Sequence, residues 1–397
     1  MLRRFALLLC VCLLASMIPA GLAEDVEAVE VFEDAAEVEL FEAEEQAAEV
    51  GEIALEAEDE AASNAAEEPV ANAKKEFVVS HGELIEYNGK GGKVTLPKSV
   101  DTIFFRGVFK NNVTQIVFPK KMDTIMDEVF RDMTKLKKVT FKSDVMLGEY
   151  AFAGCTSLKT VVFPKKFTRI GMGSFANCTS LKSISLPSGL KYINSDAFMS
   201  SGLKGTLTLP GKLEEIGEWA FHGCSGLTGV VFPASLKRIG MEAFSGCSGL
   251  KSVMFLGKST YIADTALMNL VEGEYDEEND EYEYTSVRLN PNLVIYGYEG
   301  STAEKYASEA GYAFRALPTA VKLDKSGTVT LKKGKKLTLT TTLTPENAET
   351  GLTWKSSNKK VAKVSKTGVV KAVGKGKATI TVTTANGKTA KVKIKVK

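Results

Sequence analysis

A repeat of 23 residues constrains the fold of this chain more than any other feature of its sequence. Phenylalanine marks the repeat at a constant interval, at Phe152, Phe175, Phe198, Phe221 and Phe244. Proline recurs with the same period from Pro164 to Pro233, and isoleucine from Ile170 to Ile262. One such unit cannot bury its own apolar side chains, so successive units are predicted to stack as the coils of a solenoid.

Each unit reads A-F-x-x-C-x-x-L-x-x-I-x-L-P and continues as x-x-L-x-x-I-G. In the stretch "LKSISLP", residues 181 to 187, the apolar side chains are predicted to point inward and Ser183 and Ser185 outward, because side chains alternate along a strand. Pro187 would end this strand, since proline has no N–H for the ladder.

A small residue follows the last isoleucine of most units. It is glycine or asparagine at Gly148, Gly171, Asn194, Gly217 and Gly240. These residue types tolerate positive φ, so a left-handed corner is predicted at this position.

Cysteine takes the slot three residues after the marker phenylalanine, at Cys155, Cys178, Cys224 and Cys247, and Ser201 takes it in one unit. A buried cysteine behaves as a small, weakly polar core residue. Catalysis would need a thiolate beside a base, and neither His81 nor His222 recurs with the slot. The phenylalanines and cysteines are therefore predicted to form structural ladders. Bridges within the pairs 155/178 and 224/247 stay open, because coils about 4.8 Å apart allow them while parallel Cβ vectors disfavour them.

This repeat resembles the BspA-like leucine-rich repeats of bacterial surface and secreted proteins, over residues 77–316. The segment "GELIEYNGKGGKVTLP" (82–97) resembles the first coil of that family, and "NLVIYGYEGSTAEKYASEAGYAFRAL" (292–317) the unit that closes its arrays. Within the closing unit, Ser301 or Thr302 can cap a short helix that runs to Glu309 and ends at Gly311.

The last coil departs from the family at an acidic insertion, "VEGEYDEENDEYEY" (271–284). It lacks the alternating carboxylates and glycine turn of a calcium loop, so a mobile, solvated loop is predicted.

The two N-terminal segments are predicted to be an export signal and a spacer, not parts of a folded domain. Residues 1–23 combine Arg3 and Arg4 with a short apolar run and small residues before Glu24, which is typical of a secretory signal peptide. Residues 24–76 are predicted to be a disordered or partly helical spacer, because residues 24–68 carry 19 acidic and no basic side chains. We expect an exported, extracellular or surface-associated protein with no integral membrane segment after cleavage.

Residues 317–397 change to short alternating strands separated by turns, which predicts a small β-sandwich. The elements W-x-S-S-N-x-x-V-A-x-V and G-x-A-x-I-T-V resemble the bacterial immunoglobulin-like domain of group 2 (Big2). Trp354 is predicted to be the core aromatic, and Gly368, Gly374 and Gly376 turn residues. The whole chain is thus predicted to be mostly β, a leucine-rich-repeat solenoid followed by an Ig-like sandwich.

Lysine dominates this last domain, with 19 lysines in residues 321–397 against three acidic residues. Lys391, Lys393 and Lys395 alternate along one strand. They form either a solvated outer face that protects the sheet or a surface that attracts polyanions such as teichoic acid or acidic glycans. Nucleic acid is not expected as a partner, because no aromatic stacking platform accompanies the charges.

The sequence contains no metal-spaced His and Cys cluster, no phosphate-binding loop and no catalytic triad, so we expect neither an enzyme nor a cofactor or metal. Both resemblances imply adhesion or recognition of an extracellular protein or glycan by the repeats, with the sandwich as spacer or anchor. The alternative is an envelope protein held without covalent bonds to anionic wall polymers. The candidate binding face comprises the outward strand positions Thr160, Val162, Ser183, Ser185, Thr206, Thr208, Val231, Ser252 and Met254.

Overall fold

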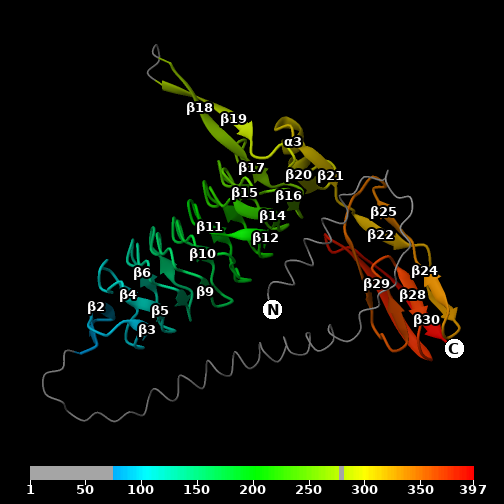
Figure 1. The fold of residues 1–397 in the computed structure, drawn as a ribbon, viewed down its shortest axis with the longest axis horizontal. Helices are drawn as coiled ribbons and strands as arrows, with labels where there is room; N and C mark the ends of the chain where they lie inside the picture. The colour runs from blue at the N-terminus through cyan, green and yellow to red at the C-terminus, as the bar shows by residue number, and fades with distance from the viewer. Residues whose placement is uncertain (1–74, 277–280) are drawn as a thin grey trace, which may run out of the picture. The chain divides into compact units, whose positions relative to one another are not determined.

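The computed structural model describes residues 75–276 and 281–397. The predicted signal peptide and nearly all of the predicted acidic spacer lie outside these residues. The described chain is mostly β, with stacked coils followed by an Ig-like domain (Figure 1). The coils begin with an antiparallel hairpin of β1 (Phe77–Ser80) and β2 (Glu83–Tyr87).

Most coils contribute one parallel strand to a first ladder. Its inward residues, such as Val139, Val161 and Val230, are buried. Thr160, the strand residue next to Val161, points the other way and is exposed. The ladder comprises the sheet β3 (Gly92–Thr95), β5 (Val113–Val117), β7 (Lys138–Thr140) and β9 (Thr160–Val162), and the sheet β12 (Lys204–Thr208), β14 (Gly226–Phe232), β16 (Ser252–Phe255), β20 (Val294–Gly297) and β21 (Ala313–Ala316).

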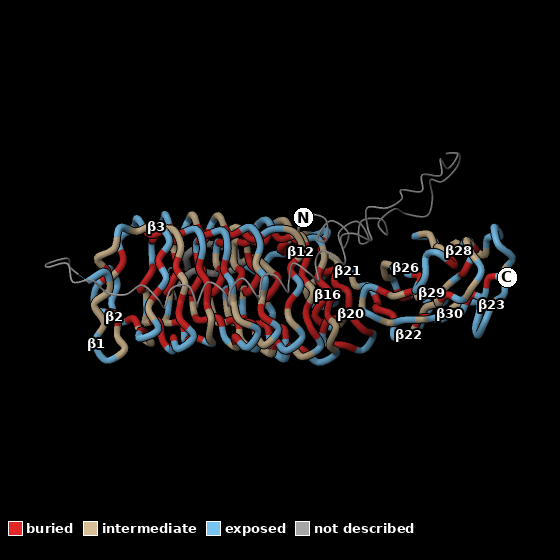
Figure 2. The backbone as a smooth tube through the Cα atoms, turned by 90° about the horizontal axis from the view of Figure 1, so that it is seen from below, coloured by how far each residue is buried: buried red, intermediate tan, exposed pale blue. Residues whose placement is uncertain are grey.

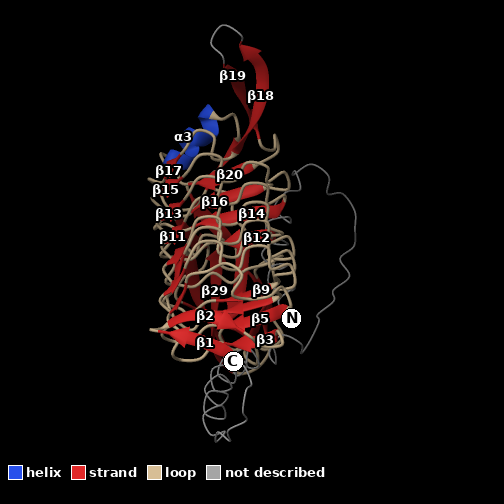
Figure 3. Cartoon of the chain, turned by 90° about the vertical axis from the view of Figure 1, so that its left-hand side faces the viewer, coloured by secondary structure: helices blue, strands red, loops and turns tan. Residues whose placement is uncertain are grey.

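A second parallel ladder runs along another side of the coils, with two residues from each coil (Figure 3). Each pair ends in a buried residue, which is isoleucine in every pair except Met146–Leu147. After β2 this ladder comprises β4 (Thr102–Ile103), β6 (Thr124–Ile125) and β8 (Met146–Leu147), and then β10 (Arg169–Ile170), β11 (Tyr192–Ile193), β13 (Glu215–Ile216), β15 (Arg238–Ile239) and β17 (Tyr261–Ile262).

The marker phenylalanines stack on one another through the centre of the coils. Their ring centroids are 4.8 to 5.7 Å apart from Phe130 to Phe244, with interplanar angles of 5 to 14°. All are fully buried, and buried positions recur in every coil (Figure 2). Leu267 ends the stack and is also fully buried. Aromatic pairs of this kind add about 0.5–1.5 kcal/mol each beyond the burial of their area.

The first ladder is interrupted at residues 181–187, where the predicted strand does not form. Ser183 and Ser185 do face solvent there, but Ile184 and Leu186 are only partly buried. The following coil reaches its leucine one residue early, at Leu203, and the register is regained between Gly205 and Thr206 of β12, where the pairing skips Thr228 of β14. The missing strand at 181–187 therefore lies next to the coil whose leucine is displaced by one residue.

The predicted left-handed corner lies elsewhere in the coil. Gly148, Gly171, Gly217 and Gly240 do not have positive φ; the positive values flank the marker phenylalanine, as at Trp219 (φ 53°) and Gly223 (φ 71°) around Phe221. Glycine recurs at this position of the repeat for a steric reason instead. A Cβ on Gly171 would lie 2.4 Å from the carbonyl oxygen of Leu147 in the preceding coil.

The acidic insertion also differs from its prediction as a loop. β18 (Met268–Asp276) and β19 (Glu281–Arg288) pair as an antiparallel hairpin with an irregularity between Glu272 and Tyr275. Tyrosine and valine, which favour strands, alternate with the glutamates here, and this pattern outweighed the high charge.

The predicted closing helix is confirmed as α3 (Thr302–Glu309). Ser301 is its N-cap, and its hydroxyl accepts a hydrogen bond from the backbone N–H of Glu304 (3.3 Å). Gly311 follows the helix with φ 71°. The helix packs against the end of the array, where Ala303 and Ala307 are buried.

The C-terminal domain has the sheets of a sandwich around its own core of residues such as Val370, Ile380 and Ile394. Trp354 is partly buried and packs against this core, and Gly368 (φ 81°) lies against the Trp354 ring. The strands are β23 (Thr328–Leu331), β30 (Thr389–Val396), β29 (Gly376–Thr384) and β26 (Leu352–Ser356) in one sheet, β24 (Lys336–Thr338), β28 (Val369–Ala372) and β27 (Ala362–Val364) in another, and the pair β22 (Ala320–Leu323) and β25 (Thr341–Thr344).

Substituting Gly171→Ala is expected to destabilise the solenoid by roughly 1–3 kcal/mol, because the new methyl group overlaps main chain that can move only with the neighbouring coil. Gly211→Ala is the matched control, since a Cβ there meets no heavy atom within 4 Å. The measurement is urea unfolding followed by circular dichroism. Equal stability of the two variants would contradict the steric role assigned to Gly171.

Candidate binding face

Main-chain pairing in the first ladder places the predicted face residues in two columns. Thr206 pairs with Gly229 and Gly229 with Ser252 in one column, and Thr208 with Val231 in the other. Gln115, Lys138 and Thr160 continue the first column through the earlier coils, and Val117, Thr140 and Val162 the second. Parallel pairing spaces the strands by about 4.8 Å, so each column is a regular row of side chains.

Six of the predicted residues give an open stretch of this face. Five of them are exposed, with Val162 at 37%, and Thr206 is half-buried. They are Thr160, Val162, Ser183, Ser185, Thr206 and Thr208. This stretch offers five hydroxyl groups and one short apolar side chain, that of Val162.

The far end of the predicted face is covered, which corrects the assignment of Met254 and Val231 as binding residues. Met254 is only 6% exposed, because it lies in an apolar cluster with Tyr296, Tyr298 and Leu317. Val231 is partly buried against the same cluster. Ser252 is half-buried. The predicted face therefore ends near Thr208 rather than at the last coil.

Lysines border the open stretch on both sides, a feature that the sequence analysis did not use. The start row lies where the strands of the first ladder begin: Lys137, Lys159, Lys182, Lys204 and Lys251. The end row follows the strands: Lys98, Lys120, Lys121, Lys165, Lys166, Lys212 and Lys258. All of these lysines are exposed. The dipeptide Leu-Lys, which recurs once in most repeats, was the available sequence signal for the start row.

Arginine and tyrosine, which are absent from the six residues of the open stretch, face outward from the second ladder. The Arg169 guanidinium lies 4.1 Å from the centre of the Tyr192 ring, and that of Arg238 lies 5.2 Å from the Tyr261 ring. Arg238 also lies 3.8 Å from the Glu215 carboxylate. These residues link successive coils to one another, as cation–π and charge pairs do across strands.

The cysteine ladder is buried and its four members are free thiols. Each thiol donates a hydrogen bond to the carbonyl of the marker phenylalanine in the preceding coil, for example Cys155 to Phe130 (3.1 Å) and Cys178 to Phe152 (3.4 Å). Ser201 occupies the same slot and lies 3.3 Å from the sulfur of Cys224. The thiol thus satisfies a carbonyl group between two coils.

Burial raises the pKa of the Cys155 thiol to about 12 and that of Cys224 to about 11. Burial also raises the pKa values of Cys178 and Cys247 well above the ordinary value of 9.0. A catalytic cysteine needs the opposite shift, because the thiolate is the nucleophile. These thiols are placed for packing.

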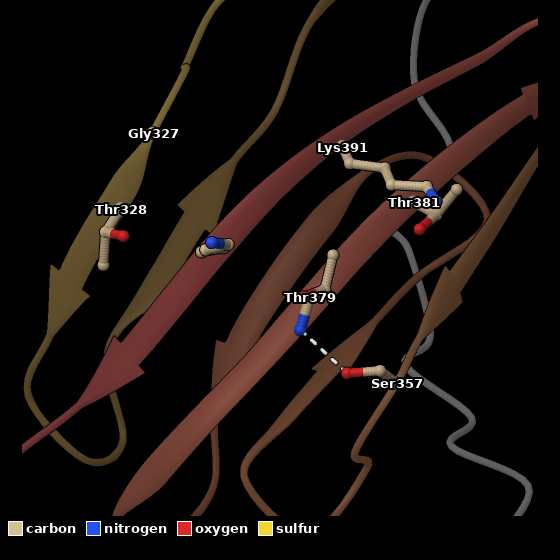
Figure 4. Close-up of a pocket in the computed structure, with 7 residues that line it drawn as sticks. Gly327, Thr328, Ser357, Thr379, Thr381 and Lys391 are labelled. Atoms are coloured by element: carbon tan, nitrogen blue, oxygen red, sulfur yellow. Dashed lines mark hydrogen bonds between the residues drawn. The ribbon is translucent and has the colours of Figure 1, made fainter.

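The Ig-like domain presents a second polar surface, on the outer face of the sheet that contains β29 and β30. A hollow there is lined by Gly327, Thr328, Ser357, Thr379, Thr381, Lys391 and Lys393, and the N–H of Thr379 donates to the Ser357 hydroxyl at 2.9 Å (Figure 4). Lys391, Lys393 and Lys395 alternate with buried residues along β30 and are exposed.

Within residues 75–276 and 281–397, no three His, Cys, Asp or Glu side chains gather in an arrangement that could hold a metal ion. In the same ranges no helix is long and apolar enough to cross a membrane.

Comparison with known families agrees with this geometry. Six copies of the BspA type leucine rich repeat region match over residues 99–228 and 145–272, and the bacterial Ig-like domain (group 2) matches over residues 319–395. The chain thus carries BspA-type leucine-rich repeats followed by a group 2 bacterial Ig-like domain. Both domain types are typical of bacterial surface or secreted proteins, and they are typically non-enzymatic.

Individual relatives and solved structures match only part of this chain. The lacto-N-biosidase of Bifidobacterium bifidum is 49% identical over 71 residues, which are 18% of this chain and 6% of that enzyme. Among solved structures, a leucine-rich repeat protein of T. pallidum is 28% identical with a TM-score of 0.35, covering 46% of this chain and 85% of its own. A leucine-rich cell surface protein of Faecalibacterium prausnitzii is 17% identical with a TM-score of 0.33, covering 64% and 96%.

Replacing Cys178 with serine is expected to cost about 1 kcal/mol or less, because Ser201 shows that a hydroxyl fits this slot. Cys178→Val is expected to cost roughly 1–3 kcal/mol, since it adds bulk and removes the donor to the Phe152 carbonyl. Urea unfolding of the two variants measures the difference. A serine variant less stable than the valine variant would contradict the role of the thiol as a small hydrogen-bond donor.

Proposed function

We propose that this protein is an exported bacterial binding or adhesion protein that carries no enzymatic activity. Its repeats recognise an extracellular protein or glycan, and its Ig-like domain serves as spacer or anchor. The carrying observation is the open stretch from Thr160 to Thr208, an exposed surface on which strands β9 and β12 flank the unpaired segment 181–187. The signal-like N-terminal sequence and the usual setting of both domain types support export.

A second candidate function rests on the lysines of β30. In this alternative the protein is a structural envelope component, and Lys391, Lys393 and Lys395 hold it to anionic wall polymers without a covalent bond. Exposed charges of this kind act through screened electrostatics, so such anchoring would weaken steeply as salt increases.

The binding proposal predicts that added bulk on the open stretch blocks recognition. Purified full-length chain would be tested on bacterial cell walls and on immobilised extracellular matrix glycoproteins. The variant Thr160→Gln/Ser183→Gln/Thr208→Gln is expected to bind roughly tenfold more weakly than the parent, which corresponds to the loss of about 1.4 kcal/mol of well-packed contact. Met146→Gln/Met241→Gln is the control, because these exposed side chains lie away from the first ladder.

Undiminished binding of the folded face variant would contradict recognition by the repeats. If binding were instead lost in Lys391→Gln/Lys393→Gln/Lys395→Gln and kept in the face variant, the envelope alternative would replace the first. Failure of the parent to bind any of these surfaces would also count against the binding proposal.

A further inference from the structure

We propose that the face between the two lysine rows binds a linear acidic polysaccharide, laid along the stack of coils. This inference deepens the proposed function, on which it rests, by assigning a ligand class to the same face. We call the surface the lysine-bordered face: Thr160, Val162, Ser183, Ser185, Thr206 and Thr208, with the start row and the end row on either side.

The rows are regular because the backbone fixes them. The N–H of Lys159 donates to the carbonyl of Lys137 (2.9 Å), and that of Lys204 to the carbonyl of Lys182 (3.2 Å). In the end row the N–H of Gly189 donates to the carbonyl of Lys165 (2.9 Å). Successive members of the start row from Lys137 to Lys204 therefore lie one coil, about 4.8 Å, apart, whereas Lys166 and Lys212 of the end row lie two coils apart with Gly189 in the coil between them. This advance per coil is of the same order as the length of one sugar unit in an extended chain.

Charge is segregated around this face. Residues 154–213 contain seven lysines, one arginine and a single acidic residue, Asp196. Six of these lysines belong to the two rows: Lys159, Lys165, Lys166, Lys182, Lys204 and Lys212. Asp196 lies at the corner before Phe198, where the Tyr150 hydroxyl donates to its carboxylate (3.4 Å). A one-sign surface of this kind attracts and concentrates polyanions.

Several acidic side chains on other sides of the solenoid form ion pairs with basic residues. Glu214 on the second-ladder side lies 2.6 Å from Lys237 and 3.6 Å from Lys191. Arg106 lies 3.1 Å from Glu128 at the corner. At the edge of the end row, both oxygens of the Asp144 carboxylate accept hydrogen bonds from Thr168. Glu214 and Glu128 are thus held in ion pairs away from the face, and the Asp144 carboxylate is held by Thr168.

The residue types favour a flexible polyanion over a compact one. Lysine is a hydrated point charge, whereas arginine recognises single carboxylate or phosphate groups through paired hydrogen bonds. The basic side chains of the two rows are lysines, and Lys182 uses one of its donors for the Thr179 carbonyl (2.6 Å). The threonine and serine hydroxyls between the rows can hydrogen-bond the hydroxyls of a sugar. Aromatic stacking residues, which single-stranded nucleic acid would need, are absent from the six face positions.

The probe is dextran sulfate, with uncharged dextran as the control for the same backbone. We expect the full chain to bind dextran sulfate, not dextran, with affinity that falls as salt rises. Lys159→Gln/Lys182→Gln/Lys204→Gln and Lys165→Gln/Lys166→Gln/Lys212→Gln should each bind roughly tenfold more weakly, as a sum of several exposed charge contacts. Lys191→Gln/Lys237→Gln, with the same change of residue type on the second-ladder side, should bind as the parent does.

Residues 24–68 carry 19 acidic side chains, so the full chain is used throughout and any competition by that segment is common to all variants. Absence of dextran sulfate binding, or equal losses in the row variants and in Lys191→Gln/Lys237→Gln, would overturn the inference. Binding lost only in Lys391→Gln/Lys393→Gln/Lys395→Gln would overturn it as well.

The sign of an added charge separates this inference from the proposed function. On the natural surface that the protein binds, Thr160→Lys/Ser183→Lys should bind more tightly than Thr160→Glu/Ser183→Glu, which adds similar bulk with the opposite charge. If both pairs weaken binding equally, the face binds a protein or a neutral glycan, and the polyanion inference fails while the proposed function stands. If neither pair changes binding, both fail.

Discussion

Main-chain hydrogen bonding between equivalent residues of successive coils is the interaction on which the rest of this structure depends. It places each residue beside its counterpart about 23 positions away, so any property that recurs in the repeat becomes a continuous row in space. The same rule gives the phenylalanine stack, the thiol-to-carbonyl ladder and the lysine rows. A coil isolated from its neighbours would have none of these partners.

Features that depend on the period were predictable, and features that depend on local sterics were not. The buried slot of Cys178 and the cap of the last helix follow from spacing and residue type. The corner after Ile170 was assigned wrongly, because a glycine that permits positive φ is indistinguishable in sequence from one that only lacks room for a Cβ. The interrupted strand at 181–187 depends on a one-residue shift in the next coil, and the hairpin at 268–288 on its β-forming tyrosines.

The candidate site was only partly predictable for a related reason. Alternation along the strands identified the outward positions from Thr160 to Thr208, but not the burial of Met254, which depends on tyrosines about 40 residues further along the chain. The lysines lie at the ends of the strands, outside the alternating positions on which the sequence analysis concentrated. Arg169 and Tyr192 contact each other between coils, whereas the lysines of the two rows are exposed on the surface where a partner can reach them.

Lysine acetylation of the full chain, read by mass spectrometry with and without dextran sulfate, tests the central claim most directly. Protection of Lys159, Lys166 and Lys182 is expected, with dextran giving none and with Lys191 and Lys237 modified equally in all samples. Protection confined to the lysines of the Ig-like domain, or spread evenly over the solenoid, would contradict the assignment of the lysine-bordered face as the binding surface.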